Sequence, residues 1–362
     1  MAIVNDGVTR HHAAIPALDG LRALAIVIVM CSHVGLQRVV PGQFGVTLFF
    51  FLSGYLITTL LRVELEEHGR IDFRRFYLRR ILRIFPPMYL TIGFFALLSL
   101  AGFIHPLSWR GLPFDLAFLT NYFPVSGMPI GLWSLAVEEH FYIAFPLVLA
   151  LLARRFSLAR CAAVFLGLCA CVLAVRIWEV HRLANFDQVN FWTHTRIDSI
   201  LFGSILALWN NPVADRRNVL PKGMAGYAVA AALLFPTFVI RDEAFRQSYR
   251  YTLQGFGLLV LFNTAIRDTG KVRAALNNRL TGHIATLSYT LYLVHSGMIQ
   301  MMSPEDGAHT LVGTVLALAA AFGYAILMHR WVERPLSRLR RRIEQAGRRG
   351  GDKPAASGAP VA

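Results

Sequence analysis

Residues 17–36 read ALDGLRALAIVIVMCSHVGL, an apolar run interrupted by three ionisable side chains, Asp19, Arg22 and His33. A helix of about 20 apolar residues can cross a bilayer, so this run predicts a membrane span. Ionisable side chains are costly inside a membrane and usually face the protein interior. Each of the three taken alone could instead extend to a membrane interface. Three on one span favour a functional site.

The spacing within this run places the charged groups relative to one another. Arg22 and His33 are 11 residues apart. In a helix this spacing returns nearly to the same face after a rise of about 16 Å. Asp19 precedes Arg22 by three residues, a spacing that allows the two side chains to pair. Arg22 and His33 are therefore expected at opposite ends of one helix face.

The rest of the chain repeats the apolar pattern. Of its 362 residues, 55% are hydrophobic and 16% are charged, whereas soluble domains have about 25% charged residues. Backbone amides cannot stay unpaired in lipid, so long apolar windows predict helices. The sequence therefore predicts an all-α fold, a polytopic integral membrane bundle of about ten transmembrane helices. The predicted spans are 17–36, 43–61, 84–104, 131–153, 158–180, 195–211, 222–240, 250–266, 282–302 and 310–330.

The basic residues indicate the orientation of this bundle. If the N-terminus is cytoplasmic, 27 of the 36 Lys and Arg residues fall in cytoplasmic segments, six in the opposite loops and three within spans. This asymmetry is typical of a membrane protein with its positive loops inside, and it predicts that both termini are cytoplasmic. The net charge of +15 therefore does not indicate a nucleic-acid-binding surface. Insertion into a membrane, in contact with its lipids, is expected.

Composition divides the chain into three parts. We expect a cytoplasmic tail over 1–16, a membrane domain over 17–335, and a basic, disordered cytoplasmic tail over 336–362. The segment FDLAFLTNYF (114–123) is expected to form a short re-entrant or interfacial helix. No cleaved signal peptide and no internal repeat are apparent. The cysteines fall in apolar stretches without metal-ligand spacing to a histidine, so we expect no metal site.

A second group of candidates precedes the third predicted span. Arg79, Arg80 and Arg83 lie at helical spacing just before the Pro86–Pro87 pair. Guanidinium groups bind phosphate oxygens through paired hydrogen bonds, so these arginines could hold a phosphorylated ligand or anionic lipid headgroups. Anchoring by the positive-inside rule explains them about as well when they are taken alone.

The fourth span contains two consecutive carboxylates, Glu138 and Glu139. At that depth they must be paired, hydrated or used in function. Glu138 is expected at a depth that His33 can share, and an imidazole oriented by a carboxylate is a common general base. A structural ion pair with Arg22 or Arg196 is the alternative.

Later spans add weaker candidates. Arg196 and Asp198 are expected to line the site, and Tyr289 is a candidate substrate-binding residue. In the second span, Ser53 and Gly54 are expected to let helices pack closely.

Together these motifs resemble the membrane acyltransferase family 3, which includes the O-antigen and exopolysaccharide acetylases. The similar motifs extend over residues 17–335 and occur in the same order as in the family. The sequences that carry it are the Arg-x10-His spacing of the first span, GVTLFFFLSGYLI (45–57), RRILRIFPPMY (79–89), WSLAVEEHFYIAFP (133–146), TRIDSILFG (195–203), SYTLYLVH (288–295) and ERP (333–335).

The resemblance implies a membrane-bound O-acyltransferase of the bacterial inner membrane. Such proteins move an acyl group, usually acetyl from cytoplasmic acetyl-CoA, to a hydroxyl of a glycan, with no metal. By motif position, Arg22 and His33 match paired essential residues, and Glu138 matches the acidic residue of the tryptophan-serine-leucine motif. Arg79, Arg80 and Arg83 fall in the arginine motif linked to the acyl-CoA. Two departures are Thr47, where many members have Asp, and His140, where many have Gln.

These expectations combine into one mechanism. The arginines hold the CoA phosphates, the pantetheine arm extends towards His33 through one passage, and His33, oriented by Glu138 or Asp19, deprotonates the acceptor hydroxyl. An acyl-histidine intermediate is a variant of this scheme. The acceptor is expected to be a glycan or lipid-linked glycan, from lipopolysaccharide, exopolysaccharide or a similar polymer. A small-molecule or peptide acceptor, a secondary transporter of sugar or lipid, and a structural role in polysaccharide export are the alternatives.

Overall fold

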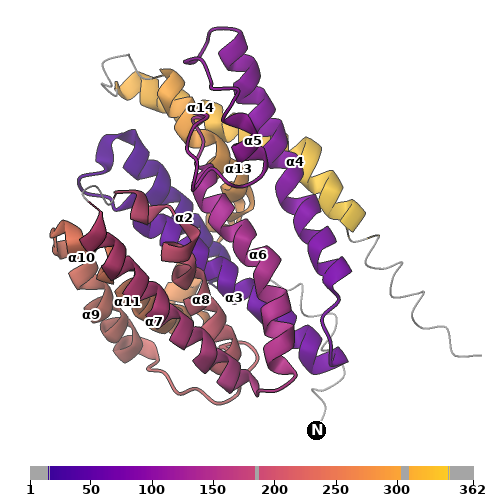
Figure 1. Cartoon of the computed structure of the whole chain (residues 1–362), viewed down its shortest axis with the longest axis vertical. Helices are drawn as coiled ribbons and strands as arrows, with labels where there is room; N and C mark the ends of the chain where they lie inside the picture. Colours follow the sequence, from indigo (N-terminus) through magenta and orange to yellow (C-terminus); the bar gives the residue numbers. More distant parts are fainter. Residues whose placement is uncertain (1–14, 16, 184–186, 303–309, 341, 343–362) are drawn as a thin grey trace, which may run out of the picture.

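A computed structural model describes residues 15, 17–183, 187–302, 310–340 and 342 of the chain. Across these residues the secondary structure is helical and contains no strand (Figure 1), which confirms the predicted all-α class. The long helices are α2 (Leu18–Cys31), α3 (Gly42–His68), α4 (Phe73–Leu100), α6 (Leu132–Ala153), α7 (Leu158–Arg182), α8 (Thr193–Trp209), α9 (Gly223–Val239), α11 (Tyr249–Arg267), α13 (Arg279–Met302) and α14 (Leu311–Met328). The short ones are α5 (Leu112–Leu116), α10 (Glu243–Gln247) and α12 (Lys271–Leu276).

Each predicted span falls on one of these long helices. In the described part of the chain, six helical runs are long and apolar enough to cross a membrane. They are Leu18–Leu36, Gly42–His68, Phe73–Leu100, Leu132–Ala153, Leu158–Arg182 and Leu311–Arg340. A multi-pass membrane protein is therefore supported, while the count of ten spans and the position of the termini stay predictions.

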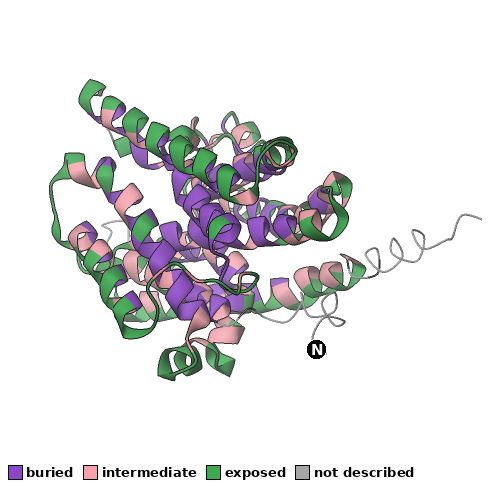
Figure 2. Cartoon of the chain, turned by 90° about the horizontal axis from the view of Figure 1, so that it is seen from below, coloured by how far each residue is buried: buried purple, intermediate pink, exposed green. Residues whose placement is uncertain are grey.

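The centre of the bundle is the packing of α3 against α8 and α2. Small residues make this approach possible. A Cβ atom added at Gly54 would lie 1.9 Å from the carbonyl oxygen of Ile200, and one added at Gly203 would lie 2.1 Å from that of Phe51. The expected packing role of Gly54 is confirmed, because two helix backbones meet at a position that has no room for a side chain. Buried residues fill the middle of the bundle and exposed residues lie on its outer faces (Figure 2).

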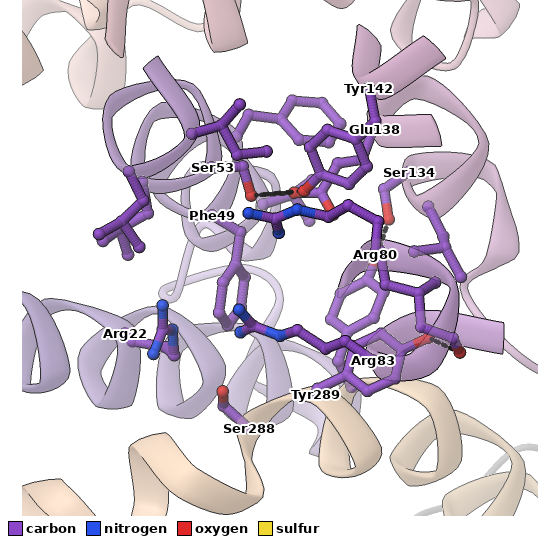
Figure 3. A pocket seen from close by; sticks show the side chains of 18 of the residues that line it. Arg22, Phe49, Ser53, Arg80, Arg83, Ser134, Glu138, Tyr142, Ser288 and Tyr289 are labelled. Carbon is purple, nitrogen blue, oxygen red and sulfur yellow. Dashed lines mark hydrogen bonds between the residues drawn. The ribbon is translucent and has the colours of Figure 1, made fainter. Parts of the chain in front are cut away.

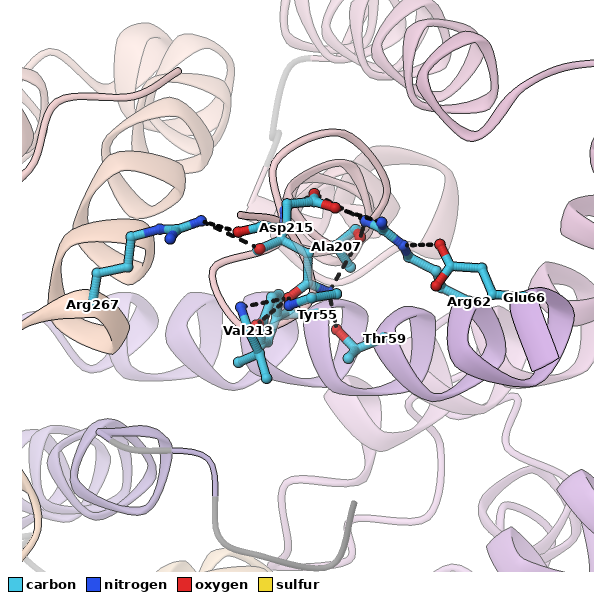
Figure 4. A network of polar contacts seen from close by, with 10 residues as sticks. Tyr55, Thr59, Arg62, Glu66, Ala207, Val213, Asp215 and Arg267 are labelled. Carbon is cyan, nitrogen blue, oxygen red and sulfur yellow. Dashed lines mark hydrogen bonds and ion pairs between the residues drawn. The ribbon is translucent and has the colours of Figure 1, made fainter. Parts of the chain in front are cut away.

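A polar network fixes one end of α3 to the segment that follows α8 (Figure 4). Arg62 of α3 is 8% exposed. It donates to Asp215, with its closest contact at 2.5 Å, and its Nε donates to Glu66 at 2.8 Å. The Tyr55 hydroxyl donates to Asn211 at 3.0 Å. The buried cation is thus balanced by two carboxylates, as a low-dielectric environment requires.

The last residues of the first span leave α-helical geometry. A π-helical segment, η1 (Ser32–Leu36), follows α2, and within it Val34 and Gly35 have non-helical torsions, with Gly35 at φ 92°. Glycine adopts this φ without steric cost. Single π turns often occur at functional sites, and this one contains His33.

Two expected segments differ from the structure. The helix expected over 114–123 is instead α5, which ends at Leu116. Phe118 adopts φ 58°, a left-handed torsion that stops a helix. The tail expected to be disordered from 336 begins as a helix that runs on to Arg340. The remainder of that tail, and nearly all of the expected 1–16 tail, lie outside the described residues.

We predict that Gly54→Ala destabilises the protein by about 1–3 kcal/mol or more, because the new methyl group overlaps the α8 backbone. Gly93→Ala is the matched control. An added Cβ at Gly93, in α4, meets nothing within 4 Å, so this variant should be neutral or more stable by up to about 1 kcal/mol. Unfolding titrations of the purified variants in mixed micelles measure the difference. Equal midpoints for the two variants would contradict the close α3–α8 contact.

Candidate active site

A cavity of about 190 Å³ opens between α2, α3, α4, α6 and α13. Apolar and aromatic side chains form most of its wall. Charged groups gather on it as well, three of them arginines (Figure 3). Its lining residues are Arg22, Val46, Phe49, Phe50, Leu52, Ser53, Leu56, Ile57, Leu60, Arg80, Arg83, Ile84, Ser134, Leu135, Glu138, Tyr142, Ser288, Tyr289 and Tyr292.

The arginines reach this cavity from two helices. Arg80 and Arg83 lie on the first turns of α4, which starts at Phe73 and is capped by the Asp72 side chain accepting from the Arg75 amide at 2.9 Å. The expected loop is therefore helical, and the helix begins well before the predicted span. Residues three apart share a helix face, so both guanidinium groups point into the cavity, and Arg22 faces them from α2 (Figure 3).

The charge on the cavity wall is unbalanced. Among its described lining residues, three are arginines and one, Glu138, is a carboxylate. The Arg80 guanidinium lies over the Tyr142 ring at 5.1 Å, a contact that offsets part of the cost of removing it from water. An excess of cations inside a narrow apolar cavity attracts an anion. The arrangement is suited to a phosphate-bearing ligand with an apolar or amide-containing arm.

Ser53 belongs to this cavity, although sequence reasoning gave it only a packing role. Its Oγ donates to Glu138 Oε1 at 2.6 Å and accepts from the Tyr142 hydroxyl at 3.2 Å. The only sequence signal was a hydroxyl at mid-depth in an apolar span. That signal is weak because serine commonly serves helix packing in membranes.

His33 lies beside this cavity and is not among its lining residues. Its ring contacts the His295 ring edge to face, with centroids 4.9 Å apart. His295 is 2% exposed, and its Nε2 is buried without a hydrogen-bond partner. The Tyr292 ring is 5.9 Å from His295, and its hydroxyl is 2.5 Å from Ser134 Oγ, at the cavity wall. His33 is therefore connected to the cavity wall through the rings of His295 and Tyr292.

The expected pairing of His33 with a carboxylate is wrong. His33 Nδ1 is 2.9 Å from the Val29 carbonyl oxygen, one turn earlier in its own helix. Glu138 bonds Ser53 instead. Asp19 pairs with Arg22 at 3.5 Å, as the spacing allowed, at the far end of α2 from His33. Among the described residues, the Val29 carbonyl therefore orients the imidazole, because Glu138 is bonded to Ser53 and Asp19 lies in the first turn of α2.

The third arginine of the α4 group points elsewhere. Arg79 is 3.9 Å from Glu64 and does not line the cavity. Of the three candidate arginines of α4, Arg80 and Arg83 therefore line the cavity and Arg79 does not. Tyr289 does line the cavity, and its hydroxyl donates to the Ile84 carbonyl at 2.8 Å.

Comparison with known proteins agrees with this geometry. A family model described as an acyltransferase domain matches residues 15–330. The chain belongs to this acyltransferase family. No solved structure matches it.

Several curated proteins are similar to this acyltransferase chain. A Staphylococcus aureus protein provisionally named an O-acetyltransferase is 30% identical over 352 residues, which cover 89% of the chain and 57% of that protein. The peptidoglycan O-acetyltransferase OatA of Listeria monocytogenes is 29% identical, over 89% of the chain and 56% of its own length. YrhL of Bacillus subtilis, provisionally named a peptidoglycan O-acetyltransferase, is 32% identical over 91% of the chain and 56% of its own length. The acyltransferase chain thus spans little more than half the length of these relatives.

Arg196 and Asp198, expected to line the site, are fully buried and are not lining residues of the cavity of this acyltransferase, although Arg196 lies behind its wall, 5.6 Å from the Phe50 ring. Asp198 pairs with Arg176 at 2.8 Å, and both side chains are 0% exposed. Arg196 lies over the Tyr251 ring at 3.5 Å, and its Nη2 donates to Thr47 Oγ1 at 3.1 Å. Asp198 is therefore the counter-ion of a buried arginine.

We predict that Asp198→Ala destabilises the acyltransferase by about 3–5 kcal/mol, because it leaves Arg176 as an uncompensated buried charge. The double variant Arg176→Met with Asp198→Leu should be less destabilised than this single variant, because it removes both charges. Unfolding of each purified variant measures the free energies. A stable Asp198→Ala protein that fails only in acceptor binding would restore the substrate-binding prediction.

Proposed function

We propose that this protein is a membrane O-acyltransferase that moves an acyl group, most simply acetyl from cytoplasmic acetyl-CoA, to a glycan hydroxyl. The observation that carries the proposal is the cavity with three guanidinium groups and one carboxylate, in a chain of the acyltransferase family. The adenosine phosphate and diphosphate of CoA supply the anionic oxygens that such a cluster binds. The names of the relatives make a peptidoglycan saccharide the first acceptor to test, ahead of lipopolysaccharide or exopolysaccharide.

The proposed topology has ten spans with both termini in the cytoplasm of a bacterial inner membrane. The positive-inside distribution of arginines supports it. In this topology the α4 arginines lie near the cytoplasmic end and His33 near the outer end. The pantetheine arm has to cover a rise of about 16 Å between Arg22 and His33. The cavity extends from Arg22 to Ser134 and Tyr292, and so provides part of this passage.

In the proposed reaction, the acceptor oxygen attacks the thioester carbon. A C–O bond forms, the C–S bond breaks, and the thiolate of CoA leaves. The acceptor proton goes to His33 Nε2 and is then transferred to the thiolate. The Val29 carbonyl, 2.9 Å from Nδ1, favours the tautomer that leaves a lone pair on Nε2. General-base assistance of this kind is worth about 10²–10⁴ in rate.

In this scheme the thioester has to pass from the cavity to His33, which contacts His295, and the His295 ring is next to Tyr292 of the cavity wall. Ser53, held by Glu138, offers a hydroxyl in the cavity wall to the amide groups of the pantetheine arm. An acyl group carried covalently on His33 is the variant of this scheme. Mass spectrometry of protein quenched after mixing with acetyl-CoA alone distinguishes the two routes.

We predict that Arg80→Ala and Arg83→Ala each raise the KM for acetyl-CoA by about 10–100-fold, the loss expected for a charge-assisted hydrogen bond. Arg79→Ala is the matched control on the same helix, and it should change KM much less because Arg79 faces Glu64. CoA release by protein in nanodiscs measures the effect. An equal rise in all three variants would indicate a general surface charge effect and contradict specific binding.

We predict that His33→Ala abolishes acetyl transfer to a saccharide acceptor at normal protein levels. His181→Ala is the control, because His181 is an exposed histidine with the same bond from Nδ1 to a carbonyl one turn earlier, 2.7 Å from Ile177. Transfer of radiolabel from acetyl-CoA to the acceptor is the measurement. Full activity of His33→Ala would refute the base assignment.

A further inference from the structure

A second cavity, of about 280 Å³, lies at the end of the bundle where α6 begins. Two segments far apart in the sequence form it, the loop before α6 and the residues that lead into α8. Its wall combines aromatic rings, Tyr122, Trp133, Phe191 and Trp192, with polar groups that include Asn121 and Gln188. None of its described lining residues is charged.

Asn121 is a buried polar residue of this cavity, and hydrogen bonds fix its side chain. Its side chain is 3% exposed, and Nδ2 donates to Thr193 Oγ1 at 2.9 Å and to the Phe191 carbonyl at 3.4 Å. Because the Phe191 carbonyl can only accept a hydrogen bond, the Asn121 atom bonded to it must be the amide nitrogen. The other terminal atom of the Asn121 amide is therefore the oxygen, Oδ1. This Oδ1 is buried without a partner. A buried acceptor without a partner is costly, and a ligand N–H or O–H would satisfy it.

The aromatic wall is preorganised by stacking. The Trp192 and His194 rings are 5.3 Å apart at 20°, and the Tyr122 and His194 rings are 5.8 Å apart at 14°. Trp133 meets Phe191 edge to face at 5.0 Å. Flat, largely apolar walls with a few fixed hydrogen-bonding groups are typical of small-molecule sites. Here they suit a ring with one apolar face and hydroxyl or amide groups at its rim.

The two cavities meet at the first turn of α6. Trp133 lines the second cavity, and the next residue, Ser134, lines the first. The Trp133 ring is 6.1 Å from the ring of Phe50, another lining residue of the first cavity. A ligand in the second cavity would therefore be separated from the arginine-lined cavity by about one layer of side chains. In the proposed topology the second cavity is at the outer end, opposite the α4 arginines.

We propose that this second cavity binds the acceptor, and that the acceptor unit is an uncharged saccharide with an amide or hydroxyl donor, such as an N-acetylhexosamine. This inference rests on the proposed function, because it assigns the second substrate of the same reaction. Trp192 supports the apolar face of the sugar, and Asn121 Oδ1 accepts from its N–H or O–H. The lack of charged groups in the described wall disfavours phosphorylated and acidic units, whose desolvation would not be compensated.

The test uses the full chain in nanodiscs and the N-acetylglucosamine tetramer as probe, with equilibrium dialysis of labelled tetramer as the binding measurement. Asn121→Ala and Trp192→Ala should each weaken binding by about tenfold or more, as expected for loss of a buried hydrogen bond or a stacking surface. Trp192→Phe should retain most of the affinity, because it keeps an aromatic face. Trp178→Ala is the control, since Trp178 is 59% exposed on α7 and outside both cavities.

Steady-state CoA release completes the test. The cavity variants should raise the KM for the tetramer and leave the KM for acetyl-CoA unchanged, a separation that general destabilisation would not produce. Tetramer binding that depends on Asn121 and Trp192, without any acetyl transfer, would refute the proposed function and keep this site. Transfer to the tetramer that is insensitive to both substitutions, or binding of a neutral peptide in preference to the tetramer, would overturn the acceptor site.

Discussion

An arginine inside an apolar bundle must be paired, hydrated or in contact with a ligand, because its removal from water costs several kcal/mol. This protein meets that constraint in different ways. Arg176 is paired with Asp198, and Arg62 with Asp215 and Glu66. Arg80 and Arg83 instead line a cavity in which Glu138 is the carboxylate among the described lining residues, and Arg22 lines it while paired with Asp19. The excess positive charge of this cavity distinguishes a binding site from a structural ion pair.

The arrangement of helices positions the charged groups of that cavity. The α3 and α8 backbones approach closely at Gly54 and Gly203, so the centre of the bundle is rigid next to the cavity wall. Arg80 and Arg83 are placed by the early start of α4 at Phe73. A rigid support of this kind limits the motion of the charged groups, and preorganised charges lose less energy to reorganisation when a ligand binds.

Arg22, Arg80 and Arg83 line the first cavity, whereas His33 is not one of its lining residues. His33 lies at a π-helical segment beside His295, and the His295 ring is next to Tyr292, which is part of the cavity wall. In the proposed reaction the acyl group has to pass between the arginine-lined cavity and His33. The first turn of α6 contributes Ser134 to the arginine-lined cavity and Trp133 to the second cavity.

The sequence by itself determined the helical class, the apolar windows and the family, and it indicated Arg22, Arg80, Arg83 and Glu138 as candidates, because apolar runs and intramembrane charges are local properties of a chain. The partners of these charges were decided only by the tertiary structure. Sequence spacing could not show that Glu138 bonds Ser53 and that Asp198 pairs with Arg176, since both pairs join residues of different helices. The same is true of the second cavity. Its walls come from segments about 60 residues apart along the chain, and only helix packing brings them together.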